Sequence, residues 1–259
     1  MVNNRATLVI ELEEIFRKRV FAIVYNRDSE EGIKDGDEKY FKHFIEEIIK
    51  KENVRDCVLI LNGPGGNLKT SILCSQLLRD NLQRYDSFVP TVVGSSLCYF
   101  VLQSDRLLIG EKSILTQMDP LFYYEGEYLR AIKHINNQNL NKSSEARKVF
   151  GPVFDNLGRI IKTRPNVFEK EVSVISNKKN YYLQKLIESW MGKDFHESGI
   201  KKDDLRNLKV NFKTQSQEIV SKATELINTC AEELAREDAR FAIQTNKIEG
   251  NYYGGYFHS

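Results

Sequence analysis

The chain has 259 residues, is 41% hydrophobic and carries a formal net charge of +2 at pH 7. That length suffices for one large α/β domain, or for a domain with an appendage. A charge this small, without a basic stripe interleaved with aromatic residues, argues against a general nucleic-acid binder. No run approaches the roughly 18 apolar residues that a membrane-spanning helix needs, and charged residues interrupt the N-terminal apolar stretch where a signal peptide would be continuous. We therefore expect a soluble cytoplasmic protein.

Strands and helices are expected to alternate through the first half of the chain. The apolar runs that predict strands are 20–25, 57–61, 89–93 and 106–109, and the helically spaced segments are 6–16, 37–51, 67–82 and 95–103. The run CVLIL at 57–61 does not alternate between apolar and polar residues, which is typical of a strand buried on both faces of a parallel sheet. Such an alternation of strands and helices implies a parallel sheet wound with right-handed crossovers.

The second half is expected to be more helical. Helical spacing predicts helices at 125–135, 143–161, 166–191 and 216–241. We expect a main domain over 1–212, a C-terminal helical extension over 213–247 and a flexible tail over 248–259.

The chain has four cysteines and no CxxC pair. They are Cys57, Cys74, Cys98 and Cys230. Three of them lie in apolar runs, so we expect buried, reduced thiols and no metal site.

The segment VLILNGPGGNLKTSI, at 58–72, joins the second expected strand to a helix through a glycine-rich turn. Its Lys69-Thr70 pair fits the end of a phosphate-binding loop, but Leu68 replaces the glycine that lets the backbone wrap a phosphate. The turn could also be only a tight connection. A third interpretation is an oxyanion hole, because glycine amides at a helix N-terminus can stabilise a developing negative charge.

An oxyanion hole requires a nucleophile beside it, and the segment VPTVVGSSLCYF at 89–100 supplies a candidate. A strand is expected to end there, and Gly94-Ser95-Ser96 opens an apolar helix. A hydroxyl at this junction would be exposed at the carboxyl edge of the sheet, where ligands bind in parallel α/β folds. A lone serine in this place is more often a helix cap, so the combination of the two loops favours a nucleophile.

The order and spacing of these motifs resemble the serine dehydrogenase proteinase family of the Clp protease/crotonase superfamily, which is related to signal peptide peptidases. The matching segments, in chain order, are Gly63-Pro64-Gly65-Gly66, Val89-Pro90, Ser95, Asp105 to Gly110, Ser113 to Pro120 and Gly192 to His196. The resemblance covers roughly 20–210, and its specificity lies in the order of the motifs rather than in any single one.

The resemblance implies a Clp/crotonase-like spiral of βα units with a mainly parallel sheet, followed by C-terminal helices. It also implies a serine peptidase in which Ser95 is the nucleophile and Gly65 and Gly66 form the oxyanion hole. In related peptidases the base is a lysine buried so that its amine is neutral. Lys133 fits this role best, and His196 is the rival base.

The resemblance further implies contacts of Ser96 and Asp119 with a peptide or protein substrate, and assembly into a homo-oligomer through the helices that follow the core. The apolar stripe at 219–234 is compatible with that assembly, and equally with a helix packed on its own domain. No cofactor, nucleic acid or membrane span is implied.

Two departures from the family pattern keep a second function open. Ser96 and Leu97 replace small residues after the nucleophile, and a leucine there could crowd the groove for a peptide. Thr116 occupies roughly the place of the catalytic histidine of Clp peptidases, so a Clp-type triad is not supported. The chain is therefore either an active serine peptidase of altered specificity or a non-catalytic peptide-binding or scaffold protein.

Overall fold

The computed structural model describes residues 4–26, 32–116, 121–130, 141–142, 144–148, 199–207, 210, 212–246 and 252–255. The chain forms two compact units, one made of Met1–Ile114 with Phe212–Ser259 and the other of Leu115–Asn211. The glycine-rich turn and Ser95 both belong to the first unit.

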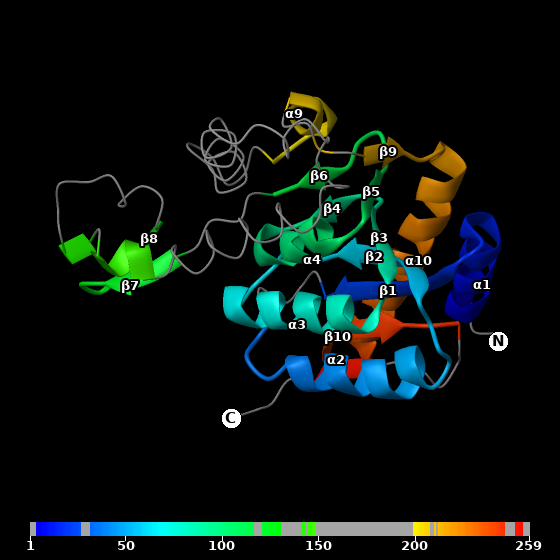
Figure 1. Ribbon diagram of the computed structural model, residues 1–259, viewed down its shortest axis with the longest axis horizontal. Coiled ribbons are helices and arrows are strands. Elements are labelled where there is room, and N and C mark those ends of the chain that lie inside the picture. The colour runs from blue at the N-terminus through cyan, green and yellow to red at the C-terminus, as the bar shows by residue number, and fades with distance from the viewer. Residues whose placement is uncertain are drawn as a thin grey trace. The chain divides into compact units, whose positions relative to one another are not determined.

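The first unit is built on a seven-stranded sheet with the strand order β11-β10-β1-β2-β3-β5-β9 (Figure 1). These strands are β1 (Arg19–Tyr25), β2 (Asp56–Asn62), β3 (Arg84–Val89), β5 (Arg106–Ile109), β9 (Phe212–Thr214), β10 (Ala239–Gln244) and β11 (Tyr252–Gly255). Strands β1, β2, β3, β5 and β9 pair in parallel, whereas β10 pairs antiparallel with both β1 and β11. Two short strands, β4 (Val92–Val93) and β6 (Ile114–Leu115), form a separate two-stranded sheet. The predicted α/β class with a mainly parallel sheet is confirmed.

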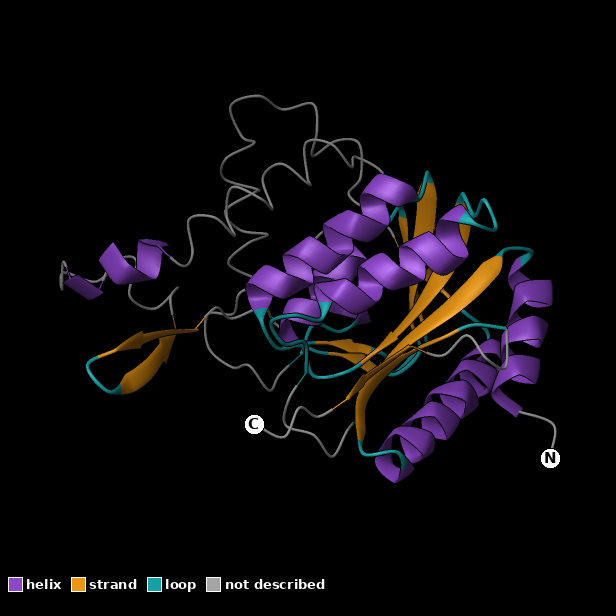
Figure 2. Ribbon diagram, turned by 90° about the horizontal axis from the view of Figure 1, so that it is seen from below, coloured by secondary structure: helices purple, strands orange, loops and turns teal. Residues whose placement is uncertain are grey.

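Helices cover both faces of the main sheet (Figure 2). They are α1 (Asn4–Phe16), α2 (Glu38–Phe44) with its π-helical continuation η1 (Ile45–Lys50), α3 (Leu68–Asn81), the 3-10 turn η2 (Ser95–Leu97), α4 (Cys98–Gln103) and α10 (Gln217–Arg236). Helices α1 and α10 pack together on one face, and α2, α3 and α4 lie on the other. Among the described helices, none combines the length and the apolar content that crossing a bilayer requires.

The two faces of β1 show why its sequence does not alternate between apolar and polar residues. Val20, Ala22 and Val24 belong to the core cluster beneath α1 and α10. Phe21 points to the opposite face, where its ring meets Phe44 of α2 edge-on with centroids 5.0 Å apart. Successive side chains of a strand point to opposite faces, so a sheet covered on both sides needs apolar residues at every position.

The apolar stripe of α10 is buried within its own unit. Ala223, Leu226, Ile227, Cys230 and Leu234 are all 0% exposed and pack in the cluster that contains α1 and the sheet. The structure thus gives this stripe an intramolecular role, and the stripe no longer supports assembly between copies.

The C-terminal segment differs from the helical extension and flexible tail that we expected. Helix α10 ends at Arg236, and Asp238, with φ +48°, turns the chain back into β10. All six residues of β10 are buried, and the strand pairs with β1 from Ala22↔Gln244 to Tyr25↔Phe241. Residues 252–255 add β11 to its outer edge. Helical spacing could not reveal β10, because Arg240 places a charge in an otherwise apolar run.

The third strand of the sheet lies before the expected segment 89–93. It is β3, and only Val89 is common to the two. Its polar residue Asp86 is 0% exposed and pairs with Lys18 at 3.0 Å and with Arg106 at 2.7 Å. These cations balance the buried carboxylate, and they come from distant parts of the sequence.

The described part of the second unit contains a hairpin of β7 (Leu121–Tyr124) and β8 (Glu127–Arg130), and the short helix α9 (Lys202–Asn207). The expected helix at 125–135 is wrong over 127–130. Glu125 and Gly126 both have positive φ, at +52° and +85°, which is the conformation of a two-residue hairpin turn.

Candidate functional site

The glycine-rich turn leaves β2 with a backbone that only glycine adopts readily. Gly65 and Gly66 have φ of +105° and +123°, and Gly66 is exposed to solvent whereas Gly65 is buried. Asn67 then begins α3, and its side-chain oxygen accepts a hydrogen bond from the Thr70 amide at 2.9 Å. The glycines thus lie between the end of a buried parallel strand and a capped helix.

A second loop, which follows β3, runs beside this turn. The Asn62 side chain donates to Thr91 Oγ1 at 3.1 Å and to the Val92 carbonyl at 3.2 Å. One step further along, the Gly94 amide donates to the Gly63 carbonyl at 2.7 Å. These bonds fix the register of the two loops, so that each residue of one has a defined neighbour in the other.

That register brings Gly65 against Ser95. A methyl group on Gly65 would lie 2.7 Å from Ser95 Cβ, too close for a real side chain, and in a tight contact of 3.0 Å with the Ser96 amide nitrogen. Ser95 itself has φ +43° and is partly exposed. A serine in the left-handed region is uncommon, and such conformations concentrate at functional sites.

Ile33 orients the peptide bond of the diglycine from the other side. Its amide donates to the Gly65 carbonyl at 2.5 Å, and its carbonyl accepts from the Asn67 amide at 2.6 Å. The Gly65–Gly66 peptide bond is trans, so its C=O and N–H point in opposite directions. The Gly66 N–H is therefore directed away from Ile33, and no hydrogen bond among the described residues uses the amide of Gly65 or Gly66.

The two serines of the Gly94-Ser95-Ser96 segment have different surroundings. Ser96 is 2% exposed, and its hydroxyl lies 2.8 Å from the Ser71 hydroxyl of α3. Its side chain ties η2 to α3, and its contact with a substrate remains a prediction. Leu97 is 0% exposed, so it packs in the core and does not crowd an open groove.

Burial also removes the nearest thiol as a rival nucleophile. Cys98 follows η2, and burial raises its thiol pKa above the ordinary value of 9.0. A buried, protonated thiol is a poor nucleophile. All four cysteines are free and buried, as predicted.

The contacts at the start of α3 do not favour a phosphate-binding loop. The Thr70 hydroxyl, which would have to meet a metal ion in such a loop, donates to Asp35 at 2.9 Å. The Thr70 amide is already satisfied by Asn67. Within the described ranges, no group of three or more His, Cys, Asp or Glu side chains is arranged to hold a metal ion.

Other residues of the sequence motifs have structural roles. Asp105 accepts from Arg79 at 2.6 Å and from the Tyr85 amide at 3.0 Å. The Ser113 hydroxyl bonds to the carbonyls of Val89 and Pro90 and so supports the loop that leads to Ser95. The other predicted site residues, Asp119, Lys133 and His196, lie outside the described residues.

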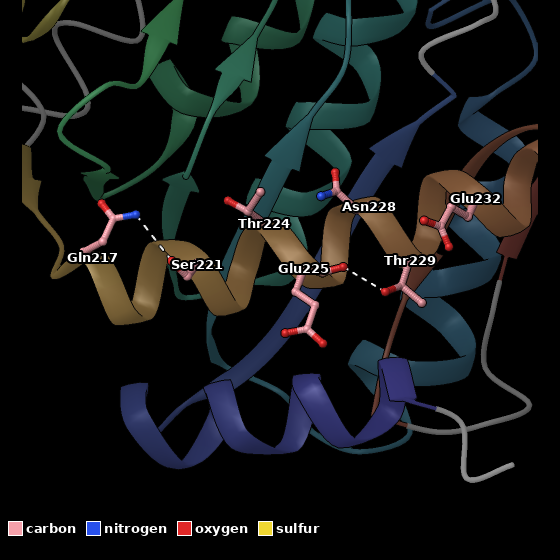
Figure 3. A pocket seen from close by; sticks show the side chains of 7 residues that line it. All are labelled: Gln217, Ser221, Thr224, Glu225, Asn228, Thr229 and Glu232. Atoms are coloured by element: carbon pink, nitrogen blue, oxygen red, sulfur yellow. Dashed lines mark hydrogen bonds between the residues drawn. The ribbon is translucent and has the colours of Figure 1, made fainter.

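A shallow surface pocket lies on the outer face of α10, remote in sequence from both loops (Figure 3). Its lining is polar and repeats at helical spacing from Gln217 to Glu232. Gln217 donates to the Ser221 hydroxyl at 3.3 Å, and Thr229 to the Glu225 carbonyl at 2.9 Å, so these polar groups partner one another (Figure 3). Such a face is typical of a solvated helix.

Gly32, Ile33 and Arg240 contribute to the site but were not predicted from the sequence. A side chain on Gly32 would collide with the Gly65 carbonyl, and the Arg240 guanidinium donates to the Gly32 carbonyl at 2.6 Å. No motif marks these residues, because their contacts join segments that are distant in the chain: Gly32 and Ile33 meet the diglycine turn, and Arg240 is 208 positions from Gly32.

No protein-family model matches the chain, and no curated protein matches it. Among solved structures, the chain is similar to a serine-to-alanine mutant of the membrane-bound stomatin-specific protease 1510-N. The identity is 13%, the coverage is 85% of this chain and 87% of that one, and the TM-score is 0.43. A lysine-to-alanine mutant of the same protease, in complex with a substrate peptide, gives 13% identity, coverage of 86% and 82%, and a TM-score of 0.45. ClpP1 from Listeria monocytogenes gives 9% identity, coverage of 80% and 98%, and a TM-score of 0.46.

Proposed function

We propose that this protein is a serine peptidase in which Ser95 is the nucleophile and the amides of Gly65 and Gly66 form the oxyanion hole. The observation that carries the proposal is the apposition of the two loops. Gly65 lies against Ser95 Cβ so closely that only glycine fits, and the Gly66 amide has no partner among the described residues. A carbonyl group that enters this junction meets a hydroxyl and unpaired N–H donors together.

In the proposed reaction, Ser95 Oγ attacks the carbonyl carbon of a peptide bond, and a base takes the hydroxyl proton. The carbonyl oxygen gains negative charge in the tetrahedral intermediate, and the glycine amides stabilise it. Donors that are already oriented before the reaction give the largest benefit, since they do not need to reorganise as charge develops. The protonated base then gives its proton to the leaving amine, and water releases the acyl group from Ser95.

Lys133 is the proposed base, and His196 is the alternative. A lysine acts as a base when burial lowers its pKa enough for a neutral amine to exist near neutral pH. Asp119 and Ser96 are proposed to contact the substrate. Substitution distinguishes the bases, because the fluorophosphonate labelling rate should fall in Lys133→Ala if the lysine is the base and in His196→Ala if the histidine is.

The test is covalent labelling by a fluorophosphonate, which reacts with an activated serine. The wild type should be labelled at neutral or alkaline pH, and Ser95→Ala should lose the label. Ser75→Ala is the matched control, because Ser75 is a buried serine of α3 whose hydroxyl bonds, among the described residues, to the Ile72 carbonyl alone. It should label as the wild type does.

Two results would redirect the proposal. Loss of the label in Ser96→Ala, with retention in Ser95→Ala, would move the nucleophile by one residue. No labelling of the folded wild type across this pH range would favour a non-catalytic protein that uses the same junction to bind peptides.

Assembly into a homo-oligomer is part of the proposal. Sedimentation of the full chain tests it, since a monomer has a mass of 30.0 kDa. A truncation near Phe212 is unsuitable for this test, because it would remove α10 and β10 from the core of the first unit.

A further inference from the structure

A buried ion pair connects β10 to the segment in front of α2. Arg240 is 3% exposed and Asp37 is 1% exposed. Arg240 Nη1 donates to Asp37 Oδ2 at 2.8 Å, and Nη2 donates to Oδ1. The pair is therefore bidentate, which fixes the plane of the guanidinium as well as its position.

The same guanidinium also reaches the start of that segment. Nη1 donates to the Gly32 carbonyl at 2.6 Å, and the Asp37 carboxylate accepts from the Lys34 amide at 2.9 Å. Arg240 thus holds both ends of segment 32–37 through directed bonds. The backbone of Arg240, in β10, is itself held in place, because its carbonyl accepts a hydrogen bond from the Asn26 amide at 2.8 Å.

Segment 32–37 is the part of the chain that orients the diglycine. Ile33 follows Gly32 directly, and its two backbone bonds enclose Gly66 between the Gly65 carbonyl and the Asn67 amide. A shift of Ile33 would release the Gly65 carbonyl, and the peptide plane that carries the Gly66 N–H would then be free to rotate.

We propose that Arg240 is a positioning residue for the oxyanion hole. It holds Gly32 and Ile33 in place, and Ile33 keeps the Gly66 N–H directed away from itself, available to the proposed oxyanion. This inference rests on the proposed function, and it assigns to the C-terminal strand a part in the site formed by the N-terminal half.

The choice of an ion pair at this position supports a positioning role. A buried pair is weak evidence for stability, because well-packed apolar residues often stabilise a core as much or more. What distinguishes this ion pair is the direction of its hydrogen bonds. The planar guanidinium donates to the Asp37 carboxylate and to the Gly32 carbonyl at the same time, whereas a lysine ammonium acts as a point charge.

The experiment compares Arg240→Met with Arg5→Met. Arg5 is 7% exposed and pairs with Glu233, whose side chain is 19% exposed, so it belongs to a second, partly buried ion pair of the same unit, between α1 and α10. Two quantities are measured for each variant: hydrogen exchange of the Ile33 and Asn67 amides, and the fluorophosphonate labelling rate per folded molecule.

We expect Arg240→Met to accelerate exchange at both amides and to lower the labelling rate by about 10- to 100-fold, since loss of one oxyanion donor costs on the order of 100-fold or more. The shape of the pH profile should not change, because the base is untouched. Arg5→Met should leave the exchange and labelling rates at wild-type values. Arg240→Lys, which keeps the charge but not the fork, should fall between the wild type and Arg240→Met.

Unchanged protection of the Ile33 amide in Arg240→Met, or equal labelling rates in Arg240→Met and Arg5→Met, would overturn the inference. If Arg240→Met does not fold, Arg240→Lys decides by the same two measurements. If the wild type is not labelled, the proposed function fails, and the exchange rates alone then decide whether Arg240 orders the diglycine. The two failures are therefore distinguishable.

Discussion

The contact between Gly65 and Ser95 makes Gly65→Ala the most informative substitution. The added methyl group would lie 2.7 Å from both the Gly94 carbonyl oxygen and Ser95 Cβ. Neither neighbour is the end of a flexible side chain, so the two loops would have to separate. The backbone also has φ +105°, which an alanine adopts only under strain.

The size of the effect follows from these two terms. Strain at an unfavourable φ costs about 1–3 kcal/mol, and overpacking costs about 1–3 kcal/mol more. Gly36 is the matched control: it has φ +91°, but a methyl group there would meet nothing within 4 Å. Gly36→Ala should therefore lose only the stability that the backbone strain costs, without the cost of overpacking.

The assay is urea unfolding of both variants, with the fluorophosphonate labelling rate measured on the folded fraction. We expect Gly65→Ala to lose more stability than Gly36→Ala and to label on the order of 100-fold more slowly, because the proposed amide donors would no longer face Ser95. Equal stability losses in the two variants, together with wild-type labelling of Gly65→Ala, would refute the apposition of the loops.

Further predictions concern the stability of the first unit and are measured by urea unfolding. Asp86→Asn should cost about 2–4 kcal/mol, since it removes the buried carboxylate that Arg106 and Lys18 share and leaves Lys18 with Asp56 alone; a loss below 0.5 kcal/mol would contradict the buried pairing. Asn67→Ala should cost about 1 kcal/mol through loss of the α3 cap, whereas Asn67→Asp should retain it. Burial raises the pKa of Cys98 above 9.0, so above pH 9 the unfolded chain loses a proton that the folded chain keeps, and stability falls by about 1.4 kcal/mol per pH unit for this thiol. In Cys98→Ala the free energy of unfolding should fall less steeply with pH, by that amount. An unchanged slope would contradict a buried thiol at position 98.

The sequence was sufficient for the parts of the fold that depend on local periodicity. The strand at β2 and the helix at α3 were predicted close to their true limits, because an unbroken apolar run and a capped amphipathic pattern are local properties. The two loops of the candidate site were likewise visible as Gly-Pro-Gly-Gly and Gly-Ser-Ser. Glycines with positive φ and a serine at a strand-to-helix junction leave a signal in the residues themselves.

Only the tertiary structure revealed the strands that contain a buried charged residue, because the oppositely charged partner of that residue lies far away in the sequence. Strand β3 was misplaced because an aspartate such as Asp86 is typical of a loop. It is stable in this buried strand because it pairs with Lys18 and Arg106. Strand β10 was missed for the same reason, since Arg240 is acceptable in a buried strand only with Asp37 opposite it.

The sequence by itself was enough to propose which residues could supply the chemistry, and the tertiary structure decided what surrounds those that it describes. No local pattern reports that Gly65 lies against Ser95, that Ser96 is buried, or that Ile33 orients the diglycine. Contacts of this kind join segments that are distant in the chain, and they exist only after the parallel strands have brought their carboxyl ends together at one edge of the sheet.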